Sequence, residues 1–507
     1  MYQKFINSSF YEVLHSFFKQ ENFKKFFFIS VGIYIIALFA LFRGNIYYID
    51  DWNSSISNTS WDHFSRFLMT IILNKIASVF KTTTDLSPLT QIFSVCFISL
   101  SAMILLYIIR KRFDTLGILA AIPLGLSPHF LENLSYKYDS LGMGMSLFLA
   151  IVPFLFKERG ILFFISSIIC LLLMYMTYQA SNGIYIVLSL YFAISLYFLE
   201  DRDLKQSLKF LLNAGLSFVL ASVIYKKFIV IPVDNYVSDS MLTLRDLFMG
   251  GGFENIKRYV VSLFNDLKKL PYFQLSFVVD IFFIGSFVIK SRRNKILSFF
   301  ACVIFVSLGF CLSYGIYFVL QKPLFEPRAF IGFGVFVGTI CIASVSLLES
   351  FKALKIRILH YLSCIIVVIM SYSLIAFATA YGNAITKQNE YIMFRSELLL
   401  RDLINIIPKD KKASIILEGS IGLAKPTNHF VGKYGGIGRL IPPIMMNAPT
   451  WYWSYAPLRH LKSPYGNFLS QSCKDKPSDS KLVFENVYHS IEAAGDCYVV
   501  ILRSVDN

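Results

Sequence analysis

Charged residues are scarce in this chain. Only 16% of its 507 residues are Asp, Glu, Lys or Arg, whereas 55% are hydrophobic, and the mean hydropathy is +0.58. Soluble globular domains carry about 25% charged residues. The shortage excludes an ordinary soluble protein and indicates a chain that lies largely within a membrane.

Familiar catalytic and cofactor motifs are missing as well. The histidines of the polar segments do not form the close His, Cys or Asp clusters of a metal site; they are His63, His129, His429, His460 and His489. No Ser-His-Asp order or nucleophile elbow is present. The run Gly250–Gly252 lacks the strand-to-helix context of a phosphate-binding loop, so it predicts a hinge. We assign no metal ligands.

Cysteines are few outside the apolar segments. Six of the eight lie within such segments, where a thiol acts as a small apolar filler. The other two, Cys473 and Cys497, lie in the C-terminal tail. An oxidising compartment would favour a disulfide between them, and the alternative is two unpaired thiols.

Long apolar segments dominate what is present. We predict eleven membrane spans, near residues 26–42, 89–109, 114–127, 141–156, 160–177, 183–199, 207–226, 273–290, 296–318, 329–348 and 359–380. No small-residue cleavage site follows the first span, which indicates an uncleaved anchor. The short segments 114–127 and 141–156 are expected to be tilted, broken or extended into their loops.

The connectors between these spans alternate in charge. Lys and Arg gather in the N-terminal tail and after the second, fourth, sixth, eighth and tenth spans. The positive-inside rule therefore predicts a cytoplasmic N-terminus. It places outside the cytoplasm the segments 43–88, 128–140, 178–182, 227–272, 319–328 and 381–507. The net charge of +16 follows from these connectors, so we expect it to meet the cytoplasmic lipid surface and not nucleic acid.

The chain divides into two predicted parts. Residues 1–380 form a mainly α polytopic membrane domain whose first outer loop is 43–88, and residues 381–507 form a small outer α/β domain. In the second part we expect a helix near 385–406 and strands at 413–417 and 497–502. The aromatic run Trp451–Tyr455 either stacks on sugars or seats this domain on the bilayer.

The first outer loop opens with two carboxylates, Asp50 and Asp51, followed by Trp52. Acids at a membrane boundary are costly and tend to be functional or paired. Adjacent side chains diverge, so only one of the two would face a site, where it could act as a general base toward a sugar hydroxyl. The alternative is a solvated helix cap. Further along, 61–81 is an amphipathic juxtamembrane helix whose Arg66 either binds a lipid phosphate or reaches the headgroups.

Two more outer loops carry dense polar groups. In 128–140 an acid, an amide, a tyrosine, a lysine and a second acid suit a polyhydroxylated ligand; they are Glu132, Asn133, Tyr136, Lys137 and Asp139. Alternatively, Lys137 only pairs with a carboxylate to stabilise the turn. In 319–328, Lys322, Glu326 and Arg328 are candidates to clamp a lipid-linked phosphate, and the alternative is an interfacial pair of Glu326 with Arg328.

These residues resemble a known family. The stretches Tyr48-Ile49-Asp50-Asp51-Trp52 and 132–140, with Trp61 and Arg66, are similar to the serotype-converting O-antigen glucosyltransferases of the phage Gtr type. The resemblance covers most of the chain. That family commonly has Gly before the Arg of its first loop, whereas this chain has Ser65.

The resemblance implies a membrane glycosyltransferase of the GT-C class in the bacterial inner membrane, with a periplasmic C-terminal domain. Its donor would be undecaprenyl-phosphate glucose, made and flipped by separate proteins, and its acceptor would be lipid-linked O-antigen. Transfer would invert the anomeric carbon and change the serotype of the lipopolysaccharide. By this analogy Asp50 or Asp51 is the base, while Arg66, Lys137 or Arg328 neutralises the departing phosphate.

Two other classes of function are alternatives. An O-antigen polymerase or ligase would consume undecaprenyl-pyrophosphate oligosaccharide, and a polytopic lipid or sugar transporter would place ionisable groups at mid-membrane. The predicted spans are nearly free of charge, which disfavours the transporter. The paired carboxylates leave a divalent cation open as a cofactor.

Overall fold

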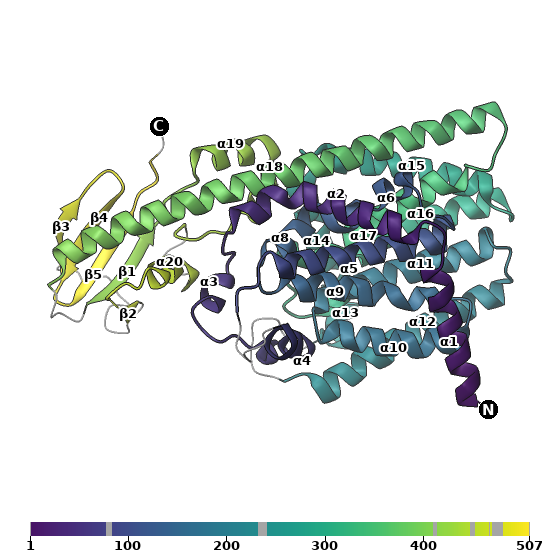
Figure 1. Ribbon diagram of the computed structural model, residues 1–507, viewed down its shortest axis with the longest axis horizontal. Helices are drawn as coiled ribbons and strands as arrows, with labels where there is room; N and C mark the ends of the chain where they lie inside the picture. The colour runs from purple at the N-terminus through teal and green to yellow at the C-terminus, as the bar shows by residue number, and fades with distance from the viewer. Residues whose placement is uncertain are drawn as a thin grey trace.

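The computed structural model describes residues 2–77, 84–231, 241–408, 413–446, 452–465, 467–468 and 480–505. Its architecture is a body of helices with a small sheet at one end, and the two chain termini mark opposite ends of the molecule (Figure 1). The prediction of a mainly α protein is confirmed.

The helices of the body follow the apolar segments of the sequence. Their bounds are α1 Tyr2–Phe18, α2 Phe23–Gly44, α3 Asp51–Ser54, α4 Phe67–Thr70, α5 Leu89–Leu105, α6 Thr115–Ala121, α7 Pro123–Leu126, α8 Pro128–Ser135, α9 Ser140–Ile151, α10 Gly160–Tyr175, α11 Asn182–Phe198, α12 Leu204–Ile224, α13 Leu244–Phe248, α14 Gly251–Leu267, α15 Pro271–Lys290, α16 Lys295–Leu312, α17 Ile331–Leu347 and α18 Leu354–Ile406. The short helices α19 Lys425–Tyr434 and α20 Ala456–His460 follow α18.

Among the described residues, seven helices are long and apolar enough to cross a membrane, and the bent pair Thr115–Leu126 with Pro128–Ser135 makes an eighth if it is one span. Shorter apolar helices cover Ser140–Phe156, Gly160–Tyr175 and Ile331–Leu347. Helices thus cover each of the eleven predicted segments. Several of these helices are shorter than the length that identifies a membrane span. The chain is a membrane protein, and the number of eleven spans stays a prediction.

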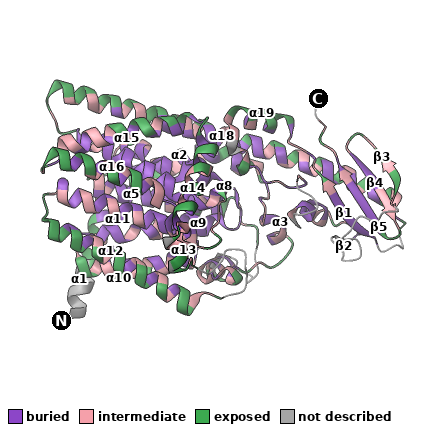
Figure 2. Ribbon diagram, turned by 180° about the vertical axis from the view of Figure 1, so that it is seen from behind, coloured by how far each residue is buried: buried purple, intermediate pink, exposed green. Residues whose placement is uncertain are grey.

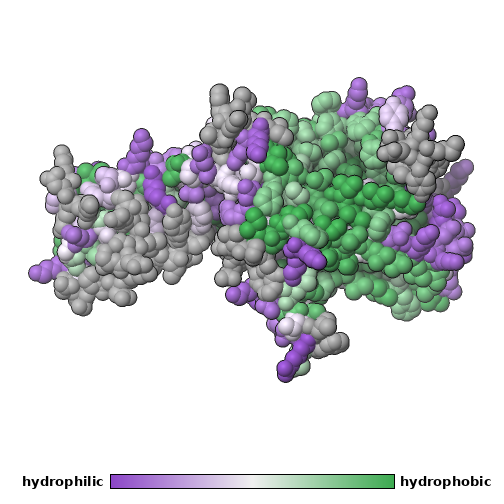
Figure 3. Space-filling view, turned by 90° about the horizontal axis from the view of Figure 1, so that it is seen from below, coloured by the Kyte–Doolittle hydropathy of each residue, from purple (hydrophilic) through white to green (hydrophobic). Residues whose placement is uncertain are grey.

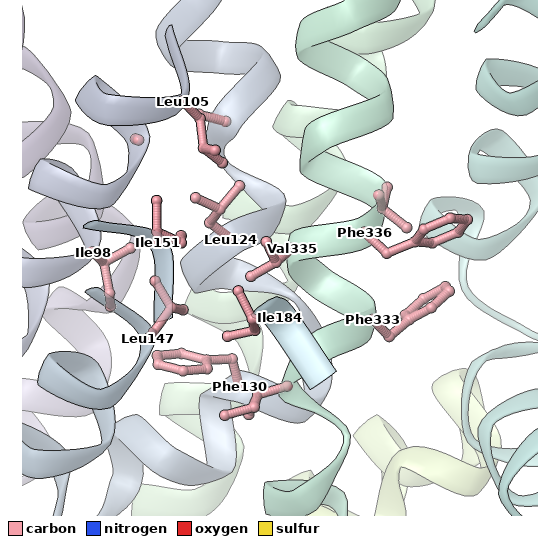
Figure 4. Close-up of a cluster of buried hydrophobic side chains, with 14 of the residues drawn as sticks. Ile98, Leu105, Leu124, Phe130, Leu147, Ile151, Ile184, Phe333, Val335 and Phe336 are labelled. Atoms are coloured by element: carbon pink, nitrogen blue, oxygen red, sulfur yellow. The ribbon is translucent and has the colours of Figure 1, made fainter. Parts of the chain in front are cut away.

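The packing of the body suits a bilayer. Buried residues fill its interior while exposed ones lie on its outer faces (Figure 2), and the face of the helical body seen in Figure 3 is largely apolar. Inside, Ile98 of α5, Leu147 of α9 and Val335 of α17 belong to one buried cluster (Figure 4). Bulky apolar side chains therefore fill the centre as well as the outer faces.

Ion pairs join the basic connectors to one another. Arg110 pairs with Glu349 at 3.4 Å, and Lys157 pairs with Glu200 at 2.9 Å. Arg159 pairs with Glu12 of α1, which Figure 1 shows at the end away from the sheet. These connectors, which the charge alternation assigned to one side, are brought together in the fold.

The long helix α18 differs from the prediction. We expected a span at 359–380 and a separate helix at 385–406, whereas α18 runs unbroken through both for 53 residues. No proline or glycine pair interrupts 380–385, so nothing in the sequence ends the helix there. α18 packs along α2 and extends from the helical body to the sheet (Figure 1).

The sheet has five strands in the order β2-β1-β5-β4-β3. They are β1 Ser414–Gly419, β2 Asn467–Phe468, β3 Lys481–Glu485, β4 His489–Ala494 and β5 Cys497–Leu502. β1 is parallel to β2 and β5, and the other neighbours are antiparallel. The strands predicted at 413–417 and 497–502 are confirmed. The core between the sheet and α18 also includes Trp52 from the first outer loop.

The amphipathic helix of the first outer loop begins later than predicted. It consists of α4 and a π-helical turn at Ile71–Ala77, and residues 78–83 lie outside the described part of the chain. It begins only at Phe67 because Ser65 adopts a left-handed conformation with φ of 58°. A glycine takes this conformation without strain, which accounts for the Gly expected at this position.

Candidate active site

A cavity of about 1180 Å³ lies where the outer loops meet the C-terminal part of the chain. Its walls come from the first outer loop, α8 and α9, the ends of α10 and α12, the segment after α16, and residues 423–446. Seven of the predicted site residues line it; they are Asp50, Arg66, Glu132, Tyr136, Asp139, Glu326 and Arg328. Segments far apart in the sequence thus form one site.

Asp50 is the carboxylate that stays open to the cavity. Its side chain makes no hydrogen bond or ion pair with the described residues, and it does not cap α3. Burial and the nearby Asp139 raise its pKa from 3.8 to about 6, although Arg328 and Arg66 act in the opposite direction. A carboxylate with this pKa is suited to take a proton near neutral pH.

The backbone before Asp50 is strained. Ile49 has φ of 41°, a value that β-branched residues rarely adopt and that costs about 1–3 kcal/mol. Strain of this kind often marks functional sites, since the surrounding fold must hold it in place. Ile49 and Asp50 both line the cavity, so the strained turn presents the acid to it.

Asp51 has a different environment. It is fully buried, and its carboxylate accepts hydrogen bonds from the backbone N–H groups of Tyr48 at 3.0 Å, Lys137 at 2.9 Å and Tyr138 at 3.3 Å. It does not line the cavity. Asp51 therefore links the first outer loop to the second and fixes their relative position.

Glu132 and Arg328 form a buried pair on the cavity wall. Arg328 donates to Glu132 from its side chain at 2.8 Å and from its backbone N–H at 2.7 Å. The alternative pairing of Arg328 with Glu326 does not form; instead Glu326 pairs with Arg439 at 3.7 Å. Both carboxylates are thus already balanced by a cation.

Asp139 and Arg66 form a second pair. The indole N–H of Trp61 donates to Asp139 at 2.7 Å, and Arg66 lies 3.9 Å from the same oxygen. Arg66 also donates to the amide oxygen of Gln179 at 2.9 Å, and its guanidinium lies over the ring of Tyr178 at 4.7 Å. The cation is therefore held in one orientation.

Aromatic groups complete the wall. Tyr136 is 1% exposed, and its hydroxyl has no hydrogen-bond partner among the described residues. Such a buried hydroxyl costs free energy unless a ligand or water satisfies it. Trp453 of the aromatic run also lines the cavity, whereas Trp451 lies outside the described residues. A sugar finds here both a ring to stack on and an unused hydrogen-bonding group.

The remaining predicted residues lie elsewhere. Lys137 pairs with Asp85 of the first outer loop at 2.8 Å and lies over Tyr47, so it joins two outer loops. Asn133 donates to the carbonyl oxygen of Arg328, and Trp52 is buried against Tyr47 and His460. Lys322 is exposed and does not line the cavity. We carry none of these four side chains into the proposed site.

Two basic residues of the wall escaped the sequence reading. Arg439 comes from the C-terminal part and pairs with Asp266 at 3.1 Å. Lys226 lies at the end of α12. A signal for Lys226 was available: it is a basic residue at the outer end of a predicted span, where the charge alternation expects none.

Two chemical expectations remain open. Within the described residues, no group of three His, Cys, Asp or Glu side chains lies close enough to hold a metal ion, so we derive no step through a cation. Cys497 is disulfide-bonded. Its predicted partner, Cys473, lies outside the described residues, so the pairing stays a prediction.

Comparison with known proteins identifies the family. The model of the family described as Glucosyl transferase GtrII matches residues 38–339, more than half of the chain. The chain belongs to this family. The resemblance found in the outer-loop motifs is thereby confirmed, and family membership makes the chain a glycosyltransferase.

A relative from Salmonella phage P22 is also similar. It is 26% identical over 461 residues, which are 86% of this chain and 89% of the relative, and it is described as an uncharacterized 55.3 kDa protein in the gtrB 5' region. No solved structure matches. The family range includes the first five outer loops, but it ends before Arg439 and Trp453.

Proposed function

We propose that this GtrII-family protein transfers glucose from undecaprenyl-phosphate glucose to lipid-linked O-antigen. The reaction takes place on the periplasmic face of the bacterial inner membrane and modifies the lipopolysaccharide serotype. One observation carries the proposal beyond the family: the cavity at the outer loops holds a carboxylate, Asp50, that has no partner among the described residues and has a raised pKa.

Asp50 acts as the general base. It takes the proton of the acceptor hydroxyl, whose oxygen then forms a bond to the anomeric carbon of glucose. The bond between that carbon and the phosphate oxygen breaks, and its electron pair leaves with the polyprenyl phosphate. Attack from the side opposite the phosphate inverts the anomeric carbon, so a β-linked donor gives an α-glucoside.

The other acids of the wall position the sugars. Glu132 and Asp139 are hydrogen-bonded to Arg328 and Trp61, so they are fixed acceptors for sugar hydroxyls. Tyr136 supplies its unused hydroxyl, and Trp453 offers a ring for stacking. Groups held rigidly in this way place the acceptor for attack without a further entropy cost.

The location of the cavity explains why the donor is a lipid. Outside the cytoplasm free nucleotide sugars are scarce, so a carrier lipid must bring the activated glucose through the membrane. A separate synthase makes this lipid and a separate flippase delivers it. The apolar body beside the cavity supplies the contact with the carrier chain.

A donor assay tests the proposal. Purified protein in proteoliposomes receives lipid-linked O-antigen and either undecaprenyl-phosphate glucose or undecaprenyl-pyrophosphate oligosaccharide. We expect glucosyl transfer with the first donor and none with the second, and a product with α configuration by NMR. Transfer from the pyrophosphate donor alone would favour a polymerase or ligase and overturn the proposal.

A further inference from the structure

Four basic side chains line the cavity, and three of them are paired with carboxylates. Arg66 pairs with Asp139 at 3.9 Å and Arg328 pairs with Glu132 at 2.8 Å. Arg439 pairs with Asp266 at 3.1 Å. The fourth, Lys226, has no carboxylate, hydrogen-bond or aromatic partner among the described residues. A dianionic ligand would therefore meet one cation whose charge is not already balanced.

Lys226 lies where the membrane surface meets the cavity. It belongs to the π-helical turn Tyr225–Ile229 that ends the candidate span Leu204–Ile229. Val219 and Val223, seven and three positions before Lys226 on the same helix face, and Phe228 on another face are all exposed, as lipid-facing residues are. One helix end thus contacts lipid and also carries a cation of the cavity wall.

The wall beside Lys226 is apolar. Val230 and Ile231, next along the chain, line the cavity together with Met241, Leu320 and Leu324, whereas the carboxylates that line it come from the first, second and fifth outer loops. A ligand that fits this division has a hydrocarbon chain at one end, a sugar at the other and an anionic group between them.

We propose that Lys226 binds the phosphate of the lipid-linked sugar donor and stabilises the polyprenyl phosphate as it leaves. This assignment rests on the proposed function. It replaces Arg66, Lys137 and Arg328 in that role, because each of those cations is paired with a carboxylate. A lysine suits the task since its ammonium is a compact charge on a flexible stem that can follow the phosphate.

The departure of the polyprenyl phosphate requires no second proton transfer. When the bond from the anomeric carbon to the phosphate oxygen breaks, the electron pair stays on that oxygen and the phosphate becomes a dianion. The ammonium of Lys226 stays protonated and donates hydrogen bonds to this developing charge. The proton of the acceptor hydroxyl resides on Asp50, so acid and cation act on different atoms.

The neighbouring Lys227 provides a matched control. It is equally charged and exposed, but its ammonium lies over the ring of Phe228 at 5.6 Å and it does not line the cavity. We compare Lys226→Ala, Lys226→Arg and Lys227→Ala in transfer from undecaprenyl-phosphate glucose. Loss of one charge-assisted contact predicts that kcat/KM falls roughly 10- to 100-fold in Lys226→Ala. Lys226→Arg restores most of it, and Lys227→Ala matches the wild type.

A binding measurement separates this proposal from the reaction itself. Detergent-purified protein is titrated with undecaprenyl phosphate, undecaprenol, inorganic phosphate and phosphatidylglycerol, and binding is followed by native mass spectrometry. Wild type should prefer undecaprenyl phosphate to the other three, and Lys226→Ala should lose the preference over undecaprenol. If the preference survives in Lys226→Ala, or phosphatidylglycerol binds equally well, the proposal is wrong. If the preference depends on Lys226 but wild type transfers no glucose, the phosphate site stands and the proposed function fails.

Discussion

At the scale of single residues, two adjacent carboxylates have separate tasks. Asp51 accepts hydrogen bonds from three backbone N–H groups and joins two outer loops, whereas Asp50 faces the cavity and has no partner in the part of the chain that the structure describes. The sequence predicted that only one of the pair would face a site, because adjacent side chains diverge. It did not say which, since the donors to Asp51 include Lys137 and Tyr138, far along the chain.

The raised pKa of Asp50 predicts how activity depends on pH. Its base form is the deprotonated one, so kcat/KM should rise with pH, reach half its maximum near pH 6 and then level off. The measurement is the rate of transfer at low donor concentration between pH 4.5 and 8.5. A rate that does not change between pH 5 and 7 would contradict the assignment.

The same shift predicts a pH dependence of stability. Because the pKa of Asp50 is higher in the folded protein than the usual 3.8, the folded state favours the proton, and stability falls as pH rises from about 4 to about 6. Asp50→Asn stays neutral throughout. Its melting temperature in detergent should therefore exceed that of wild type at pH 8, with a smaller difference at pH 4.

The sequence predicts many residues of the cavity wall but not the ion pairs and hydrogen bonds between them. It gave seven of the residues that line the cavity, because acids and arginines in outer loops are rare and costly. It could not give the partners, since Glu132 and Arg328 meet only through the fold. The sequence did not predict Lys226, because the positive-inside rule expects basic residues at the cytoplasmic ends of spans and assigns no role to one at an outer end.

At the scale of elements, α18 joins the two predicted parts of the chain. Periodicity and hydropathy located the apolar half of this helix and the polar half separately, since their compositions differ. Only the structure shows one helix that passes from the body to the sheet. Its contact with α2 is close at Gly382, where an added Cβ would come within 2.5 Å of the backbone nitrogen of Leu41.

This contact predicts the effect of a larger side chain. Gly382→Val should push α18 away from α2 and destabilise the protein by about 1–3 kcal/mol, since backbone cannot yield as a side chain does. Gly32→Ala, on the face of α2 with nothing within 4 Å, is the control. Thermal unfolding in detergent measures both, and equal melting temperatures would mean that the two helices do not meet as closely as described.

At the scale of the whole molecule, the basic connectors and the sheet lie at opposite ends. The ion pairs of Arg110, Lys157 and Arg159 gather the basic connectors at the end where α1 lies. The sheet lies at the other end, together with the last part of α18 (Figure 1). The charge alternation predicts that these two ends lie on opposite sides of the membrane, since orientation follows Lys and Arg near the spans.

Labelling from one side of the membrane tests this orientation. Lys387→Cys in the polar half of α18 should react with a membrane-impermeant maleimide in spheroplasts, and Lys205→Cys at the start of α12 should react only after permeabilisation. Both positions are exposed, so accessibility within the protein does not differ. The reverse pattern would leave the cavity facing the cytoplasm, where the proposed donor is not presented.

The central claim is that Asp50 takes the proton of the acceptor in the cavity, and one comparison tests it most directly. Asp50→Asn and Asp51→Asn are purified, and glucosyl transfer per folded molecule is measured alongside melting temperature. Asp50→Asn should remain folded and lose transfer by about 10²- to 10⁴-fold, whereas Asp51→Asn should unfold more readily and keep transfer in the molecules that fold. Full transfer by folded Asp50→Asn would contradict the account.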